Sequence, residues 1–142
     1  MKFNPDEVIR NHIDSGNTVK ILIAEDELIT QRFLELTLQK LGFSCDLSSD
    51  GSDTLDKIRK NHYDIVLLDM QLPILSGEEV LTAMMEEGLI SRSFVIAQTA
   101  YTLKKDINRF LSLGCRSHIS KPISPHKLKV KIAEALLQLS GK

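Results

Sequence analysis

Three acidic residues, a threonine and a lysine each follow a predicted β-strand, at the point where that strand ends. Glu25 and Asp26 come directly after the apolar run VKILIA, and Asp69 ends the run IVLLD. Thr99 closes the run SFVIAQT, and Lys121 follows the short segment RSHIS. In an open parallel sheet, ligands bind beyond the carboxyl ends of the strands. We therefore expect these side chains to lie together at one edge of a sheet.

Crowding of acids at one edge has an electrostatic consequence. Two carboxylates about 4 Å apart repel each other by about 4 kcal/mol at an effective dielectric constant of ~20. Lys121 balances only one of the three acids, so either an acid binds a proton or the site binds a cation. Mg²⁺ suits such a site, because it takes one or two carboxylates, several waters and a phosphate oxygen. The spacing therefore predicts a magnesium site.

The same residues could carry phosphoryl chemistry. A carboxylate held beside Mg²⁺ and a lysine can attack phosphorus as a nucleophile and form an aspartyl phosphate. Asp69 is the candidate nucleophile, because residues 70–72 continue away from the strand before any helix begins. Lys121 and the metal would offset the charge of the transferred group, and the Thr99 hydroxyl would supply a hydrogen bond. Glu25 and Asp50, taken singly, are equally well explained as turn residues or helix N-caps.

Hydrophobic spacing alternates between strand and helix periods five times along the chain. Strands are predicted over 19–24, 43–48, 63–69, 93–99 and 116–120, each followed by a helix. Five such units with short connections predict an α/β fold with a parallel sheet and helices on both faces. Residues 1–17 fall outside the repeat and form a separate N-terminal extension, in which Asn4-Pro5 could start a short helix that ends near Gly16. Residues 18–142 form the main domain.

Two helices have apolar positions that can be assigned to a face. In the helix after the first strand, the apolar face is predicted to carry Ile29, Phe33, Leu36 and Leu41. In the last helix, Ser124 is the predicted N-cap and Pro125 the first helical residue. Its buried stripe is predicted to carry Leu128, Ile132, Leu136 and Leu139.

Composition sets limits on the class of protein. The chain has 142 residues, of which 42% are hydrophobic and 26% charged, as expected for a soluble globular domain. A net charge of -1 gives no reason to expect a nucleic-acid or membrane partner. No secretory leader and no apolar stretch of ~18 residues is present, so we expect a cytoplasmic protein. Cys45 and Cys115 make neither a disulfide framework nor a zinc site.

Four fragments together carry a family resemblance. ILIAEDE, IVLLDMQLPILSG, AQTA and SKPIS, in this order and at these strand ends, closely resemble the receiver domain of two-component response regulators. The match covers about Val19 to Leu139. It implies the flavodoxin-like, doubly wound (βα)5 fold with strand order 2-1-3-4-5. That order places Cys45 and Cys115 near opposite edges of the sheet, too far apart for a disulfide.

The resemblance also implies a role for each site residue. Asp69 is the phosphorylated aspartate and a ligand of Mg²⁺, Asp26 is the direct metal ligand, and Glu25 reaches the metal through water. The backbone carbonyl of Gln71 completes the protein's share of the coordination. The hydroxyl of Thr99 moves to bond the phosphoryl group, and Lys121 pairs with that group. The predicted neighbours of the phosphate are Met70, Ala100 and Tyr101; Gln71 and Tyr101 tune the hydrolysis of the acyl phosphate.

One position departs from the commonest pattern of the family. The rotating switch residue lies three before the lysine and is usually Tyr or Phe, but here it is His118. This histidine could turn inward when Thr99 moves, or it could be an exposed residue of an edge strand. The output face is expected on the fourth helix, fifth strand and fifth helix of the repeat. We expect His12, His62 and His126 to be surface residues.

These features favour one function and leave a close variant open. We expect a phosphorylation-controlled binding module, not a conventional enzyme, that accepts its phosphoryl group from a histidine kinase or phosphotransfer protein and acts on a downstream protein. The variant is a receiver excised from a hybrid histidine kinase or longer regulator, acting in a phosphorelay. A flavin carrier is disfavoured because AEDELIT puts acids where flavin phosphate would bind. An aspartate phosphatase would need an acid in place of Gln71, and a degenerate receiver would lack groups that are all present.

Overall fold

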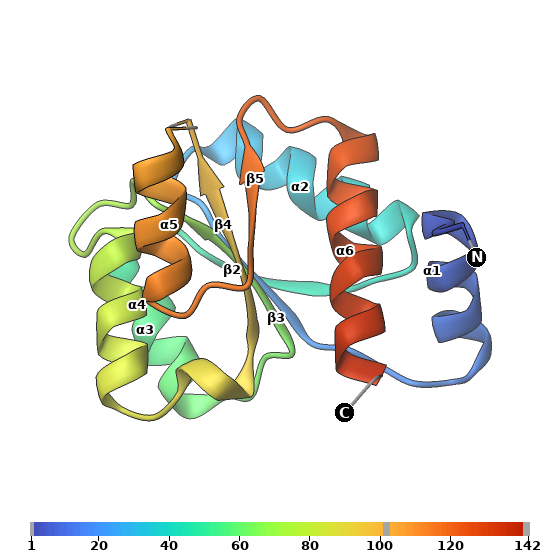
Figure 1. The fold of residues 1–142 in the computed structure, drawn as a ribbon, viewed down its shortest axis with the longest axis horizontal. Coiled ribbons are helices and arrows are strands. Elements are labelled where there is room, and N and C mark those ends of the chain that lie inside the picture. Colours follow the sequence, from blue (N-terminus) through green and yellow to red (C-terminus); the bar gives the residue numbers. More distant parts are fainter. Residues whose placement is uncertain (1, 101–102, 141–142) are drawn as a thin grey trace.

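A five-stranded parallel sheet lies between two layers of helices (Figure 1). The computed structural model describes residues 2–100 and 103–140. The strands are β1 (Ile21–Ala24), β2 (Cys45–Ser48), β3 (Ile65–Asp69), β4 (Phe94–Thr99) and β5 (Ser117–Ser120). Their order in the sheet is β2-β1-β3-β4-β5. The predicted fold class and strand order are therefore confirmed.

Two helical layers bury the two faces of the sheet. The helices are α1 (Pro5–Asp14), α2 (Leu28–Lys40), α3 (Gly51–Lys60), α4 (Gly77–Glu86), α5 (Lys104–Ser112) and α6 (Pro125–Ser140), with a short 3₁₀ turn, η1 (Ile90–Arg92). Helices α2 and α6 cover one face, and α3, α4 and α5 cover the other (Figure 1). None of the described helices combines the length and apolarity needed to cross a bilayer. The cytoplasmic location stays a prediction.

The central strands are buried on both sides, which explains their continuous apolar sequences. Every residue of β1, β3 and β4 is buried. Alternate side chains enter different cores: Ile65 and Leu67 pack under α2 and α6, whereas Val66 and Leu68 pack under the opposite layer. A strand that is buried on both faces has no solvent-facing side on which polar residues would be expected. Its polar residues are therefore confined to its end.

The predicted apolar face of α2 is wrong for two of its four residues. Ile29 is 82% exposed and Leu36 is 42% exposed, whereas Phe33 and Leu41 are half-buried. The side chains that this helix buries are Gln31, Leu34 and Leu38. The buried stripe is hidden in the sequence because it begins with a glutamine. The Gln31 amide donates hydrogen bonds to the carbonyls of Glu25 (3.0 Å) and Ser48 (3.4 Å).

The N-terminal helix forms where the sequence predicts it. The side chain of Asn4 accepts a hydrogen bond from the backbone N–H of Glu7, and Pro5 is the first helical residue. The chain leaves the helix through Gly16, whose φ is 78°. Ile9 of α1 is buried in the core that α6 shares, and Asp6 pairs with Lys129 of α6 at 3.0 Å. The helix is thus packed onto α6 (Figure 1).

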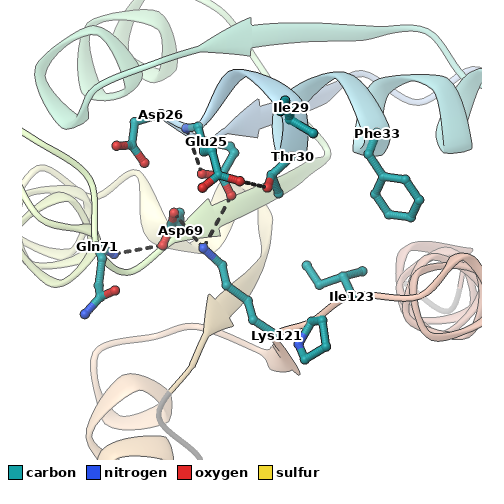
Figure 2. Close-up of a pocket in the computed structure, with 11 residues that line it drawn as sticks. Glu25, Asp26, Ile29, Thr30, Phe33, Asp69, Gln71, Lys121 and Ile123 are labelled. Atoms are coloured by element: carbon teal, nitrogen blue, oxygen red, sulfur yellow. Dashed lines mark hydrogen bonds and ion pairs between the residues drawn. The ribbon is translucent and has the colours of Figure 1, made fainter.

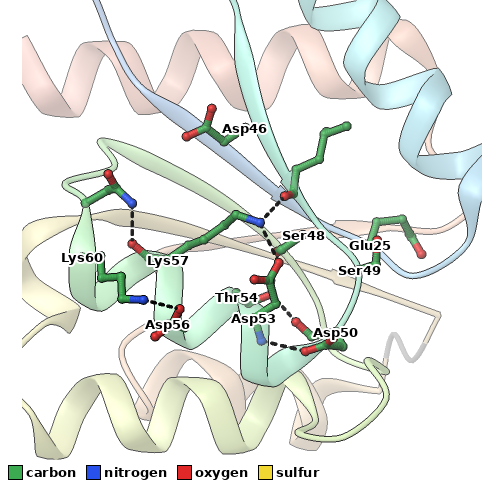
Figure 3. Close-up of polar contacts among 12 residues, drawn as sticks. Glu25, Asp46, Ser48, Ser49, Asp50, Asp53, Thr54, Asp56, Lys57 and Lys60 are labelled. Carbon is green, nitrogen blue, oxygen red and sulfur yellow. Dashed lines mark hydrogen bonds and ion pairs between the residues drawn. The ribbon is translucent and has the colours of Figure 1, made fainter.

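Side-chain caps fix the N-terminal ends of α3 and α6. Asp50 caps α3 by accepting the backbone N–H of Asp53, and the Thr54 hydroxyl shares a hydrogen bond with Ser48 at the end of β2 (Figure 3). Asp50 thus has the N-cap role considered from sequence. In α6, Ser124 accepts the N–H of Lys127, as predicted. The predicted stripe Leu128, Ile132 and Leu136 is buried, and Leu139 packs against the same core.

The cysteines are far apart and unbonded, as predicted. Cys45 begins β2 at one edge of the sheet, and Cys115 lies just before β5 at the other edge. Both are free thiols.

The loop from β3 to α4 closes tightly on Gly77. A Cβ atom at this position would lie 2.6 Å from the carbonyl oxygen of Asp69 and 2.6 Å from the Cα of Met70. Real side chains do not come so close to backbone atoms, so only glycine fits. The backbone N–H of Gly77 also donates to the carbonyl of Met70 at 3.2 Å. This glycine therefore sets the position of Asp69 relative to α4.

We predict that Gly77→Ala lowers the free energy of unfolding by about 2–3 kcal/mol, because backbone atoms cannot move aside. Gly88→Ala is the matched control, because Gly88 has φ 72° but open space around it. Its strain alone costs roughly 1 kcal/mol. Urea denaturation measures both. Equal losses in the two variants would contradict the close approach at Gly77.

Candidate acidic phosphoacceptor site

Glu25, Asp26 and Asp69 meet at the carboxyl edge of the sheet. Ala24 of β1 pairs with Leu68 of β3, so the next residues, Glu25 and Asp69, come side by side. One carboxylate oxygen from each of the three acids lies within 4.8 Å of the others. Glu25 and Asp69 are buried, whereas Asp26 is exposed. The acids line a cleft of about 740 Å³ (Figure 2).

Lys121 supplies the positive charge of this site. Its ammonium donates a hydrogen bond to Asp69 Oδ2 at 2.9 Å and lies 3.4 Å from Glu25 Oε1 (Figure 2). Burial acts to lower the pKa of Lys121, but the hydrogen bond and charge of Asp69, together with Glu25, outweigh it and raise that pKa. The lysine therefore stays charged at physiological pH. One ammonium faces three carboxylates, as the sequence predicted.

The pKa of Glu25 is raised in this poorly solvated, negatively charged site. Burial raises the pKa of Glu25 to about 7, and repulsion by Asp69 adds to the rise. The backbone N–H of Glu27, which donates to Glu25 Oε2 at 3.1 Å, and the charge of Lys121 act in the opposite direction. Oε1 is buried and is paired with Lys121 by charge only, because its contact lacks hydrogen-bond geometry. The site thus holds more negative charge than its own donors satisfy.

The donor set fits a divalent cation with a preference for oxygen. Three clustered carboxylates, one with an oxygen that accepts no hydrogen bond from the described residues, match the ligands that Mg²⁺ takes. Gln71 lines the same cleft, and its backbone N–H donates to Asp69 Oδ1 at 2.9 Å. The residues predicted to hold the metal are therefore brought together.

The predicted phosphate-site residues are distributed around the end of β4. Thr99 is buried, and its carbonyl accepts the N–H of Lys121 at 3.0 Å. Met70 is buried, and its N–H donates to the carbonyl of Gln98 at 3.1 Å. Ala100 is exposed. Tyr101, which was predicted to tune hydrolysis of the acyl phosphate, lies outside the described residues.

His118 is half-buried on β5, between the two alternatives considered from sequence. It pairs with Ala97 of β4 and lines a groove with His126 and Lys131 of α6. Burial lowers the pKa of His118, and the charge of Lys131 lowers it further. Its part in switching stays a prediction.

A group of exposed apolar side chains at the carboxyl edge of the sheet, here called the apolar rim, was missed from sequence. Four large apolar side chains are 60–82% exposed, and all follow the carboxyl ends of strands: Leu28, Ile29, Ile74 and Leu103. Ile74 has φ 72° and sits in a turn in which the N–H of Leu75 donates to the carbonyl of Pro73 at 2.9 Å. This three-residue turn is rare and strained for a β-branched residue. Apolar residues are normally assigned to the core, so the exposure of these four side chains could not be predicted from the sequence.

Comparison with known proteins adds independent evidence. The family model described as the response regulator receiver domain matches residues 21–133. Among curated proteins, the hybrid signal transduction histidine kinase I of Dictyostelium discoideum is 37% identical over 118 residues, covering 77% of this chain but only 7% of that protein. The polar-differentiation response regulator DivK of Brucella ovis is 34% identical over 107 residues, covering 75% of this chain and 87% of DivK.

Solved structures give the same answer. The Ssk1 receiver domain of Saccharomyces cerevisiae, crystallised with the histidine phosphotransfer protein Ypd1, matches with a TM-score of 0.80 at 26% identity, over 86% of this chain and 91% of that one. The receiver domain of a sensor histidine kinase from Pseudomonas aeruginosa, with magnesium in its active site cleft, matches with a TM-score of 0.74 at 26% identity. That match covers 89% of this chain and 100% of the other.

We predict that Glu25→Gln stabilises the metal-free protein at pH 8. The raised pKa means that the folded state binds more protons than the unfolded state between pH 4.5 and about 7, so stability falls as pH rises through this window. Removing the charge should restore about 1–2 kcal/mol in urea denaturation with a chelator present. Glu86→Gln, which changes an exposed glutamate at the end of α4, is the control and should have no effect. A Glu25→Gln protein no more stable than the parent would contradict the poorly solvated charge.

Proposed function

The chain belongs to the response regulator receiver family, and from this premise we propose that Asp69 accepts a phosphoryl group from a protein phosphohistidine in a Mg²⁺-dependent reaction. The proposal is carried by the environment of one carboxylate. Asp69 is 3% exposed, yet it lines the open cleft and has a separate donor on each oxygen. Oδ1 accepts the N–H of Gln71, and Oδ2 accepts the ammonium of Lys121. Such a carboxylate is held in one orientation toward an incoming group.

The transfer forms one bond and breaks one. An oxygen of Asp69 attacks phosphorus, the P–O bond forms as the P–N bond to the donor's imidazole breaks, and the leaving nitrogen keeps the electron pair. The ammonium of Lys121 moves from the carboxylate to the phosphoryl oxygens, because these oxygens then carry the negative charge. Asp26, Asp69, Glu25 through water, and the carbonyl of Gln71 would hold Mg²⁺. When bound, Mg²⁺ supplies charge neutralisation for the phosphoryl oxygens.

The readout of phosphorylation is proposed to pass through β4 and β5. The hydroxyl of Thr99 moves to the phosphoryl group, and His118 responds on β5. The N–H of Lys121 donates to the carbonyl of Thr99, which ties the ends of the two strands together. The face formed by α5, β5 and α6 then presents a changed surface to a downstream protein. The chain catalyses only its own phosphorylation and dephosphorylation.

The second candidate is a receiver that forms part of a larger phosphorelay protein. The 37% identity to a hybrid histidine kinase, of which the chain spans a small fraction, favours this variant. The similarity to most of DivK favours a single-domain regulator. Both share the chemistry of Asp69 and differ only in what lies beside the domain.

The apolar rim supports docking of a phosphodonor protein. Ile29 lines the cleft that contains Asp69, so a donor protein that reaches Asp69 contacts it. Leu28, Ile74 and Leu103 are exposed in segments that follow strand ends at the same edge of the sheet. Exposed apolar side chains clustered at a polar site are typical of interaction surfaces. A small phosphodonor needs the cleft alone.

Incubation with Mg²⁺ and acetyl phosphate tests the main proposal. We expect a base-labile mass gain of one phosphoryl group in intact-protein mass spectrometry, and its absence in Asp69→Asn, which lacks the nucleophilic oxygen. Asp56→Asn, an exposed aspartate of α3, is the control and should label normally. Failure of the parent to label with acetyl phosphate and other donors, or labelling of Asp69→Asn, would refute the proposal.

Ile29→Asp separates docking from chemistry. We expect it to slow transfer from a histidine phosphotransfer protein active on the parent by about tenfold or more, because an anion replaces an apolar contact. Labelling by acetyl phosphate should stay within about twofold. Leu137→Asp is the control, since Leu137 is 48% exposed on α6. Equal slowing with both donors would show that the substitution impairs the chemistry in the cleft and not the docking of the donor protein.

A further inference from the structure

Gln98 belongs to the same row of side chains as the acids. On β4, Ile96 packs under α2 and α6 and Ala97 packs under the opposite layer, so Gln98 faces the α2 and α6 side. Asp69 faces the same side, because Leu67 does. Gln98 is directly opposite Asp69 in the parallel ladder. The row therefore runs from Glu25 through Asp69 to Gln98.

The side-chain amide of Gln98 is the one buried polar group of this row that makes no hydrogen bond with the described residues. Its side chain is 0% exposed, and neither the nitrogen nor the oxygen has a hydrogen-bond partner within residues 2–100 and 103–140. The fold does satisfy a comparable group elsewhere: the Gln31 amide donates to two carbonyls and to the hydroxyl of Ser49. Phe94 to Ala97 are all apolar, so packing alone would be served by another apolar residue. A buried amide without a hydrogen-bond partner destabilises the folded state. We therefore expect Gln98 to have a role other than packing.

The neighbouring acceptor for this amide, the carboxylate of Asp69, is bound by other donors in the structure. Neighbouring strands lie about 4.8 Å apart, so the carboxyl group of Asp69 is within reach of a glutamine on β4. In the structure, however, Asp69 Oδ2 accepts the ammonium of Lys121 and Oδ1 accepts the N–H of Gln71. Lys121 follows β5, beyond β4, and so its side chain crosses β4 to reach Asp69. Gln98 lies beside an acceptor that a stronger, charged donor holds.

We propose that Gln98 is a positioning residue for the phosphorylated state, in which its side-chain N–H replaces Lys121 as the donor to the carboxyl group of Asp69. This inference rests on the proposed function. Phosphorylation removes the negative charge of the carboxyl group and places charge on the phosphoryl oxygens. The ammonium then moves to the phosphoryl group, and a neutral donor suits the uncharged acyl oxygen that it leaves. The amide is unpaired at rest and paired after transfer, so it favours the phosphorylated state.

Two opposite effects of Gln98→Leu test the proposal. Loss of the unpaired amide should raise the melting temperature of the metal-free protein. Loss of the donor should weaken binding of beryllium fluoride with Mg²⁺, a mimic of the phosphoryl group, by about five- to tenfold in isothermal titration calorimetry. Gln98→Met, which keeps the side-chain length, should behave in the same way. Ile96→Val, on the same strand and face, should lower the melting temperature and leave the affinity within about twofold.

A spectroscopic readout distinguishes positioning from packing. In the parent labelled with ¹⁵N, the side-chain amide protons of Gln98 should shift downfield and exchange more slowly when beryllium fluoride binds. Unchanged affinity in Gln98→Leu would overturn the proposal and leave the amide as a tolerated cost. A lower melting temperature of metal-free Gln98→Leu would also overturn it, because the amide would then have a partner, such as a buried water, at rest.

The outcomes separate this inference from the function on which it rests. If acetyl phosphate does not label the parent at Asp69, the proposed function fails and the role of Gln98 fails with it. If the parent is labelled and Gln98→Leu binds beryllium fluoride as tightly as the parent, only the role of Gln98 is refuted.

Discussion

The site depends on one lysine that reaches across a strand to hold buried carboxylates together. Glu25 and Asp69 are 1% and 3% exposed, and the ammonium of Lys121 lies between them. Without that cation, two acids on adjacent strand ends would repel each other in a poorly solvated place. With it, the pair is tolerated but remains short of positive charge, as the raised pKa of Glu25 records. This shortage of positive charge fits the proposed binding of a divalent ion and of a phosphoryl group.

The position of these side chains follows from the sheet. Strands β1, β3 and β4 run parallel between two helical layers, so their carboxyl ends coincide and their polar residues are confined to those ends. Gly77 lets α4 begin close behind Asp69, because no other residue fits against the Asp69 carbonyl. The apolar rim adds exposed apolar side chains at the same edge of the sheet. The buried charge of Glu25, the strained turn at Ile74 and the unpaired amide of Gln98 each lower the stability of the folded state. All three lie at this edge of the sheet.

Much of this arrangement could be predicted from the sequence, and the exceptions share a physical cause. The change between strand and helix periods predicted a parallel sheet with helices on both faces, and the family resemblance implied its strand order. The residues at strand ends predicted the cluster of Glu25, Asp26, Asp69 and Lys121, because parallel strands end at one edge. The buried face of α2 could not be predicted, because a glutamine begins it and isoleucine and leucine lie outside it. Gln98 was invisible for a related reason: its significance lies in a missing partner, which only coordinates reveal. The rim was hidden because exposure cannot be read from apolar character.

The packing of α1 on α6 has a consequence for how the chain folds during synthesis. The two helices stand at opposite ends of the described chain, yet Ile9 and Leu136 belong to one core (Figure 1). Contacts between such distant segments form only after a long loop has closed. While the ribosome is still making α6, the inner surface of α1 and the part of the sheet that α6 covers stay exposed. A nascent chain is therefore expected to stay accessible to chaperones until α6 has emerged.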